Sequence, residues 1–433
     1  MNFRNCAFIA LALLLPACGG GGGGSAIPSG NGNGSSLPPG NHATPTPSPA
    51  PSPVGALQHA CPPAAPGTAT CYALIRTDSV NLQPMLRRFL AARRDDATYS
   101  GPLRPADIES LYRLPATYTG SRVPTIAIVD AYDDPNAEAD LSHYRKYFGL
   151  PQCTSSNGCF KKVNQSGASG SFPGPDTGWS GEISLDLDAA SAACPTCRIA
   201  LVEASSNSWQ DLGTAEDTAA GMNPAAISNS YGGAEYLGAS SHYTHPNTIV
   251  TASTGDNSFY GGPQQPASYA TVVAVGGTSL YHNVGVSRGW NELAWSNGGS
   301  GCSSMVSRPS WQNPAITGCM NRSEADISAF ADPFNPGIWV WNSYTGGAGS
   351  GGWYVDGGTS AASPLVAAMY ALANNASALG GGYAQSIWLD AGRSTFDVTQ
   401  GNNGYCNPIV QCAAAVGYDG PSGWGAPNGL GAF

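Results

Sequence analysis

The sequence predicts an α/β protein built on a doubly wound, mostly parallel sheet with helices on both faces. Short apolar runs alternate along the chain with longer segments of helical pattern, starting with residues 124–130 and 136–148. Hydrophobic residues make up 42% of the 433 residues, which is ample for a large core. In such sheets the functional residues lie at the carboxyl ends of the strands, so the residues directly after each apolar run are candidates for functional residues.

The alternation continues to the end of the chain. Further helices are expected over residues 181–193, 211–222 and 365–373, and a shorter helical pattern covers 82–92. Further apolar strands are expected at 198–204, 225–228, 248–252, 271–275, 338–341 and 353–355.

Charged residues are few and the balance is acidic. They make up 11% of the chain, against roughly 25% in typical domains, and the formal net charge is −10. Such a chain lacks the basic surface that nucleic-acid recognition needs, so nucleic acid is excluded as a partner. Few titrating groups also leave few ion pairs to lose in acid.

The N-terminal residues have the pattern of an export signal. Arg4 precedes the apolar stretch 7–15, which is too short to span a bilayer. The sequence Leu15-Pro16-Ala17-Cys18 resembles a bacterial lipoprotein cleavage site, so Cys18 is the candidate for a lipid anchor, and ordinary signal cleavage is the alternative. Either way the protein is expected outside the cytoplasm, membrane-anchored or secreted. The predicted organisation is a signal peptide at 1–18, a Gly/Ser/Pro-rich linker at 19–55, a short extension at 56–104 and the main domain at 105–433.

The cysteines outside the signal fall into close sequential pairs. An even number of cysteines in an exported chain predicts a disulfide framework. For Cys194-Pro195-Thr196-Cys197 a redox or metal pair is the alternative, although no second such motif accompanies it. The expected bridges are Cys61–Cys71, Cys153–Cys159, Cys194–Cys197, Cys302–Cys319 and Cys406–Cys412.

A serine after two glycines opens the most apolar predicted helix. Ser360 follows Gly357 and Gly358, which permit a tight turn, and precedes the apolar run 365–373. A hydroxyl at a helix N-terminus lies at the positive end of the helix dipole, which favours developing negative charge. The alternative is that Ser360 or Ser363 merely caps the helix.

A serine nucleophile needs a base, and the usual histidine is missing. A subtilisin-like arrangement would place Asp130 at the end of the first strand and Ser360 at the start of a late helix. It also requires a histidine in a His-Gly-Thr context, and the chain has none. We interpret the histidines as ordinary surface or core residues: His42, His59, His143, His242, His245 and His282.

Carboxyl groups stand where the base is expected. Glu182 and Asp186 are four residues apart on a predicted helix and therefore share a face. An inward-facing pair of this kind is reasonable only if the two groups share a proton; a solvated acidic face is the alternative. Asp256 follows an apolar strand, where it reaches the carboxyl edge of the sheet, and a plain turn is the alternative. After another strand, Ser230, Tyr231 and Gly232 are expected to offer backbone groups to an extended substrate.

Taken together, Glu182, Asp186, Asp256 and Ser360 in this order resemble the sedolisin (serine-carboxyl peptidase) family. The resemblance covers roughly residues 105–433 and continues in the motifs at 228–233, 274–280, 290–296 and 325–329. It implies a subtilisin-like fold and an endopeptidase that cleaves protein or peptide substrates in acid. It also implies a catalytic set of Ser360, Glu182 and Asp186, with Asp256 in the oxyanion hole. The alternatives are a catalytically silent surface binding module and a neutral subtilisin-type enzyme.

Two departures from the family pattern affect activation and metal binding. The extension at 56–104 is too short for the large prodomain that family members usually carry. The usual calcium site pairs an Asp-Val or Asp-Ile with a later Gly-Trp-Asp, but here Asp397-Val398 is followed by Gly423-Trp424-Gly425. We therefore expect no cofactor and weakened or lost calcium binding, unless Asp419 substitutes for the missing carboxylate. We expect the protein to be a monomer.

Overall fold

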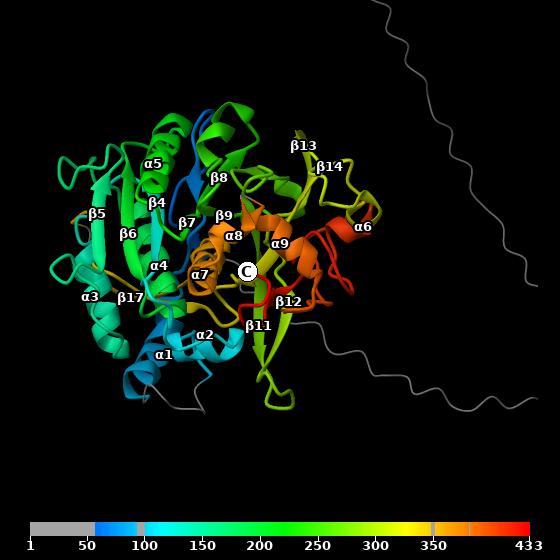
Figure 1. Cartoon of the computed structure of the whole chain (residues 1–433). Coiled ribbons are helices and arrows are strands. Elements are labelled where there is room, and N and C mark those ends of the chain that lie inside the picture. Colours follow the sequence, from blue (N-terminus) through cyan, green and yellow to red (C-terminus); the bar gives the residue numbers. More distant parts are fainter. Residues whose placement is uncertain (1–56, 93–99, 348–350, 381) are drawn as a thin grey trace, which may run out of the picture. The chain divides into compact units, whose positions relative to one another are not determined.

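The structure is a computed structural model that describes residues 57–92, 100–347, 351–380 and 382–433 (Figure 1). The predicted signal, its Cys18 and the linker at 19–55 lie outside the described residues. The extension and the main domain belong to one compact unit, Ser52–Phe433. Within the described part of the chain, no helix is both long and apolar enough to cross a bilayer.

A central sheet of eight strands forms the framework, and all its pairings except β11–β12 are parallel. The strand order is β12-β11-β9-β7-β4-β6-β5, with β15 also paired to β11. The mostly parallel α/β fold expected from the sequence is therefore confirmed. The strands are β4 (Thr125–Ala131), β5 (Phe160–Asn164), β6 (Arg198–Ala204), β7 (Ala226–Asn229), β9 (Ile249–Ser253), β11 (Val273–His282), β12 (Trp290–Ala294) and β15 (Ile327–Phe330).

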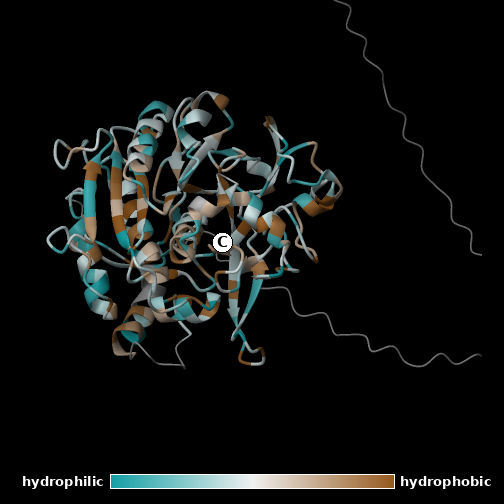
Figure 2. Cartoon of the chain, in the orientation of Figure 1, coloured by the Kyte–Doolittle hydropathy of each residue, from teal (hydrophilic) through white to brown (hydrophobic). Residues whose placement is uncertain are grey.

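Helices cover both faces of this sheet because its strands are apolar on both sides. In β4, Ile126 and Ile128 belong to one hydrophobic cluster, whereas Ala127 and Val129 belong to another on the opposite face. Helices α3 (Ala137–Phe148), α4 (Thr177–Ala193) and α7 (Thr359–Ala373) contribute to the first cluster, and α5 (Trp209–Gly221) contributes to the second. Several of these central strands carry apolar colour along much of their length in Figure 2.

Two of the predicted strands lie outside the central sheet. Strands β16 (Ile338–Asn342) and β17 (Gly352–Gly357) pair antiparallel in a four-stranded sheet with β1 (Leu57–His59) and β3 (Leu74–Arg76). The segment between β16 and β17 is shorter than the dozen or so residues that a parallel crossover needs, so the two strands form a hairpin. A third sheet joins β2 (Thr70–Cys71), β8 (Tyr231–Ala234) and β10 (Gln264–Gln265).

The remaining elements are short or peripheral. They are α1 (Ser79–Ala91), α2 (Pro105–Tyr112), β13 (Gly301–Ser307), α6 (Pro314–Thr317), β14 (Asn321–Glu324), α8 (Ala376–Leu379), α9 (Tyr383–Asp390), β18 (Thr395–Phe396), β19 (Ala426–Pro427) and the 3₁₀ turns Leu237–Tyr243, Phe259–Gly261 and Ile409–Gln411.

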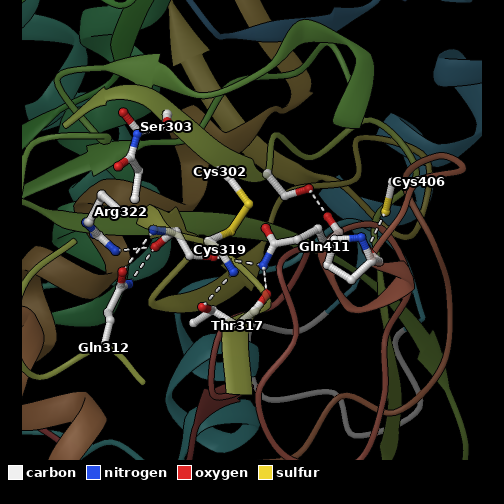
Figure 3. The surroundings of a disulfide bond; sticks show 12 residues. Cys302, Ser303, Gln312, Thr317, Cys319, Arg322, Cys406 and Gln411 are labelled. Atoms are coloured by element: carbon white, nitrogen blue, oxygen red, sulfur yellow. Dashed lines mark hydrogen bonds between the residues drawn. A yellow bond between two sulfur atoms is a disulfide. The ribbon is translucent and has the colours of Figure 1, made fainter. Parts of the chain in front are cut away.

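All five expected disulfides are present, including Cys194–Cys197, so that pair is a structural clip. Cys302–Cys319 ties strand β13 to the turn before β14 (Figure 3). Beside it, the amide of Gln411 donates hydrogen bonds to the carbonyl of Thr317 at 2.7 Å and to the hydroxyl of Ser323 at 2.9 Å. This region, which carries little regular secondary structure, is thus held by cross-links and side-chain hydrogen bonds.

Candidate active site

Helix α4 carries the two carboxyl groups into the interior. Asp176 begins the helix by accepting hydrogen bonds from the backbone N–H groups of Gly178 and Trp179 at 2.9 and 3.0 Å. The helix packs against the sheet on one side and against α7 on another, so Glu182 and Asp186 are both fully buried. A solvated acidic face is therefore ruled out for this pair.

Ser360 lies in the first turn of α7, fully buried beside the two carboxyl groups. Its hydroxyl donates to the carbonyl oxygen of Ser230 at 3.2 Å, and hydrogen bonding from Ser360 lowers the pKa of Glu182. Gly358 occupies the N-cap position, so Ser360 does not cap the helix. Ser363 is likewise no cap, because its hydroxyl contacts the hydroxyls of Ser228 at 2.9 Å and Thr251 at 3.0 Å, which fixes α7 to strands β7 and β9.

Pro364 lies in the second turn of α7 and removes one hydrogen bond from the helix. A proline has no backbone N–H, so the carbonyl oxygen of Ser360, four residues earlier, has no partner within the helix. The hydroxyl of Ser230 donates to that carbonyl at 3.2 Å instead. Ser230 and Ser360 are therefore joined twice, which holds strand β8 against the start of α7.

Burial and mutual repulsion govern the charge of the carboxyl groups. Burial is the largest cause that raises the pKa of Glu182 well above its usual value, and the neighbouring Asp186 raises it further. The pKa of Asp186 is likewise raised by burial and then by Asp130, whereas hydrogen bonding from Ser230 and Glu182 lowers it. The single proton of the Ser230 hydroxyl can be given either to Asp186 or to the Ser360 carbonyl. The pair is therefore suited to share one proton across a range of acid pH.

Asp130 extends this chain of carboxyl groups, and the sequence analysis did not include it among the site residues. It is the penultimate residue of strand β4, is fully buried, and neither of its oxygens has a hydrogen-bond partner among the described residues. Burial, and then Glu182 and Glu203, raise its pKa well above the ordinary value. A carboxylate that ends a buried strand was the available signal. We set it aside because Asp130 was considered only as part of a histidine-dependent arrangement.

Asp256 lies on the other side of Ser360, after strand β9. Its Oδ1 accepts hydrogen bonds from the backbone N–H and the hydroxyl of Thr359 at 2.8 and 2.7 Å. Its Oδ2 has no partner among the described residues, and burial raises the pKa of Asp256 to about 7. Below that pH the free oxygen can carry a proton and act as a hydrogen-bond donor.

Gly358 keeps open the space in front of Asp256. Its φ of 95° lies in the left-handed region that favours glycine. A Cβ on this residue would lie 2.7 Å from Oδ2 of Asp256 and would collide with the carbonyl oxygen of Tyr72. Only glycine therefore allows a carbonyl group to approach Ser360 and Asp256 together.

Ser230, Tyr231 and Gly232 line one edge of the site. Ser230 precedes strand β8, and its carbonyl oxygen accepts from both the Ser360 hydroxyl and the backbone N–H of Tyr72, each at 3.2 Å. Strand β2 pairs antiparallel with β8, with Thr70 opposite Gly232 and Cys71 opposite Tyr231. The edge expected to receive a substrate strand is thus paired with a segment of the chain itself.

The carboxylates considered for a calcium site accept hydrogen bonds from the protein. Both oxygens of Asp397 face the backbone N–H of Gly417, and Gly425 offers no carboxylate. Asp419 accepts from the N–H of Ala415 at 3.0 Å and from the N–H and hydroxyl of Ser422 at 2.9 and 2.7 Å. Within the described residues, no group of three or more His, Cys, Asp or Glu side chains could hold a metal ion.

Comparisons with known proteins find similar sequences and a similar solved structure. Kumamolisin from Bacillus sp. (strain MN-32) is 29% identical over 367 residues, which cover 75% of this chain and 62% of kumamolisin. Sedolisin from Pseudomonas sp. (strain 101) is 33% identical over 174 residues, covering 37% of this chain and 28% of sedolisin. A solved structure of Pseudomonas sedolisin, a serine-carboxyl proteinase complexed with two molecules of pseudo-iodotyrostatin, superposes with a TM-score of 0.62 and 25% identity. It matches 76% of this chain and 96% of that one.

These findings support membership of the sedolisin family. The family resemblance noted in the sequence and the subtilisin-like fold are thereby confirmed. No family model matches the chain, and it spans less than two thirds of the length of the curated relatives reported above. Members of this family are serine-type peptidases, and the site described here has the residue types that such a peptidase requires.

Proposed function

We propose that the chain is a serine-carboxyl endopeptidase that hydrolyses protein or peptide substrates in acid. The observation that carries the proposal is the buried group around Ser360, in which two carboxyl groups stand where a base is needed and no histidine takes part. Among the described histidines, His242 instead contacts Asp217 at 2.7 Å, away from Ser360. Ser360 is the nucleophile, Glu182 takes its proton, and Asp186 holds and shares that proton.

The steps follow from the positions of these groups. As Ser360 Oγ attacks the substrate carbonyl carbon, its proton moves to Glu182 and negative charge develops on the carbonyl oxygen. Protonated Asp256 donates a hydrogen bond to that oxygen, aided by its place next to the N-terminus of α7. Glu182 then gives the proton to the leaving amine, and water hydrolyses the acyl-enzyme by the same route in reverse.

Loss of the nucleophile and loss of the base test this assignment. Ser360→Ala and Glu182→Gln should each lower the rate of hydrolysis of a denatured protein by several orders of magnitude. The double variant should be little worse than either single variant, because the two groups act as one unit. Retained hydrolysis in Ser360→Ala would show that another group carries the chemistry. No hydrolysis by wild type under any condition would favour the silent binding module.

The cellular location of the protein is a further part of the proposal. We propose a location outside the cytoplasm, because five disulfides form and persist in oxidising compartments. Attachment through lipid on Cys18 and a monomeric state belong to this proposal, and mass spectrometry of the mature N-terminus tests the lipid.

We also propose that the fold does not depend on calcium. The carboxylates of Asp397 and Asp419 accept hydrogen bonds from N–H groups, which a bound cation would have to displace. A chelator should therefore leave the melting temperature unchanged within error. A decrease of many degrees would show that a calcium site exists.

A further inference from the structure

Several large apolar side chains are exposed on the loops around β13, β14 and α6, which lie at one side of the molecule (Figure 1). Exposed apolar residues that are scattered singly are ordinary, whereas neighbouring ones mark a surface that contacts a partner. Four residues from three segments of the chain form such a group. We call this group the apolar ledge: Tyr260 (70% exposed), Met320 (83%), Tyr405 (83%) and Ile409 (63%).

Contacts between the three segments bring the members of the ledge together. The hydroxyl of Tyr260 accepts a hydrogen bond from the backbone N–H of Tyr405 at 3.2 Å. Farther along, Pro408, which precedes Ile409, packs against Gly318, where a Cβ would lie 2.5 Å from the proline ring. Gly318 belongs to the turn that leads to the fourth member of the ledge. The four residues therefore lie along one continuous stretch of surface.

Cross-links and hydrogen bonds hold the ledge in place. The disulfide Cys302–Cys319 ends one residue before Met320, and the disulfide Cys406–Cys412 begins one residue after Tyr405. Between these bridges, the side-chain amide of Gln411 donates across to the neighbouring loop (Figure 3). A surface that is already fixed loses little conformational entropy when a partner binds. The exposed side chains are thus presented by a preformed scaffold.

The three segments that carry the ledge have no charged side chains. No Asp, Glu, Lys, Arg or His occurs in residues 257–263, 309–321 or 398–418, although the chain has a net charge of −10. The side chains of these segments therefore offer a partner apolar area and uncharged hydrogen-bonding groups, but no ion pairs. Because none of them changes charge between acid and neutral pH, the surface keeps its apolar character over that whole range.

The ledge is connected to the candidate active site. Tyr260 follows Asp256, the proposed oxyanion donor, by four residues. The backbone N–H of Phe259 donates to the carbonyl oxygen of Asn403 at 3.0 Å, two residues before Tyr405. The turn that follows the oxyanion donor and the loop that carries the ledge are therefore bonded to each other, and the ledge continues the surface that begins at the site.

We propose that the apolar ledge binds exposed apolar segments of unfolded protein substrates and holds them beside the candidate active site. The occupant is an unfolded polypeptide with aromatic and aliphatic side chains, because the ledge offers two phenol rings, a thioether and a branched aliphatic group, and no charge. Folded proteins bury such segments, so the ledge favours denatured protein over folded protein. The inference rests on the proposed function and adds a substrate-binding surface outside the catalytic group.

Binding by an inactive variant tests the ledge without hydrolysis. In a Ser360→Ala background, fluorescence anisotropy measures the Kd for a labelled protein that has been reduced and alkylated so that it stays unfolded. Met320→Ser combined with Tyr405→Ser should raise this Kd at least fivefold, because less apolar area is buried on binding. Added salt should not weaken binding, because no ion pair is involved. Binding that weakens as salt is added would overturn the apolar mode of recognition.

The matched control removes exposed apolar side chains elsewhere. Leu90 on α1 and Val284 in the turn between β11 and β12 are 54% and 88% exposed, and Leu90→Ser with Val284→Ser should leave the Kd unchanged within error. In active enzyme, the ledge variant should raise KM for denatured protein at least fivefold with little change in kcat. Its kcat/KM for a tetrapeptide should match wild type, because so short a substrate does not need the ledge.

The outcomes separate the ledge from the proposed function. An unchanged Kd in the ledge variant, or an equal change in the control variant, would overturn the ledge and leave the proposed function standing. Equal losses for denatured protein and tetrapeptide would also overturn it, since a disturbed Asp256 would explain both. Ledge-dependent binding by a wild type that hydrolyses no substrate would support the ledge and count against the proposed function.

Discussion

At the scale of single residues, Asp256 is the group whose chemistry changes most with pH. One of its oxygens accepts from Thr359 while the other faces the space beside Ser360. A carboxylate has only acceptors, so Asp256 can stabilise an oxyanion only when it is protonated. Because burial raises the pKa of Asp256 to about 7, the protonated form predominates in acid and is lost as the pH rises through neutrality.

Two substitutions at Asp256 follow from this argument. Asp256→Asn keeps an oxygen for Thr359 and supplies a permanent N–H donor of similar shape, whereas Asp256→Ala removes the donor. We expect Asp256→Ala to lower kcat by about 10²–10³ and Asp256→Asn to lose clearly less. The asparagine variant should also flatten the alkaline limb of the pH–rate curve. Equal losses in the two variants, with unchanged curves, would exclude the donor role.

Local patterns made Ser360, Glu182, Asp186 and Asp256 candidates, and their combination, which resembles the sedolisin family, gave them roles. The structure places all four in the interior around the start of α7. The roles of Asp130 and Pro364 could not be predicted from the sequence, because they depend on which groups lie next to these residues in the folded protein. A sequence places a carboxylate at the end of a strand but does not show that its neighbours are other carboxyl groups.

At the scale of elements, the strength of the local pattern decided what could be predicted. The strand expected at 198–204 was predicted with correct bounds, because a continuous apolar run in a parallel sheet has a strong signature. Strands β16 and β17 were predicted as strands, but their antiparallel pairing was missed. Strands β2 and β3 were not recognised at all. They are two or three residues long and pair with strands more than a hundred residues away.

The bridge between Cys61 and Cys71 should hold strand β2 and the following Ala73, whose N–H donates to Glu182, in place. Closing a loop of this length stabilises a fold by about 2–3 kcal/mol, and here the effect should be local. In a Ser360→Ala background, Cys61→Ser with Cys71→Ser should speed hydrogen exchange of the Ala73 amide and leave β4 and β6 protected. Removing Cys153 and Cys159 in the same way is the control and should leave the Ala73 amide unchanged. Equal exchange at Ala73 in both variants would show that the bridge does not hold this segment.

At the scale of the whole molecule, buried carboxyl groups make stability depend on pH. Burial raises the pKa of Glu203 to about 8 and that of Asp419 to about 7, and it acts in the same direction on Glu182, Asp186 and Asp356. Between about pH 4 and pH 8 the folded protein therefore holds more protons than the unfolded chain. Stability from these groups is complete at the acid end and is lost as the pH rises. The half-buried histidines, whose pKa burial lowers, oppose this trend only weakly because there are few of them.

We accordingly expect the free energy of unfolding to fall by more than about 2 kcal/mol between pH 4 and pH 8. Urea unfolding of Ser360→Ala, which avoids self-digestion, measures this change at fixed ionic strength. A free energy that rises over this interval would mean that the buried carboxyl groups are ionised and paired in the folded state.

The pH dependence of kcat/KM for a denatured protein substrate tests the central claim most directly. The measurement uses wild-type enzyme, with near-ultraviolet circular dichroism at each pH to confirm that the protein is folded. A carboxyl donor with a pKa of about 7 predicts high activity in acid and loss above neutrality, while the fold persists. Equal turnover by folded enzyme at about pH 4 and about pH 8 would contradict the role of protonated Asp256.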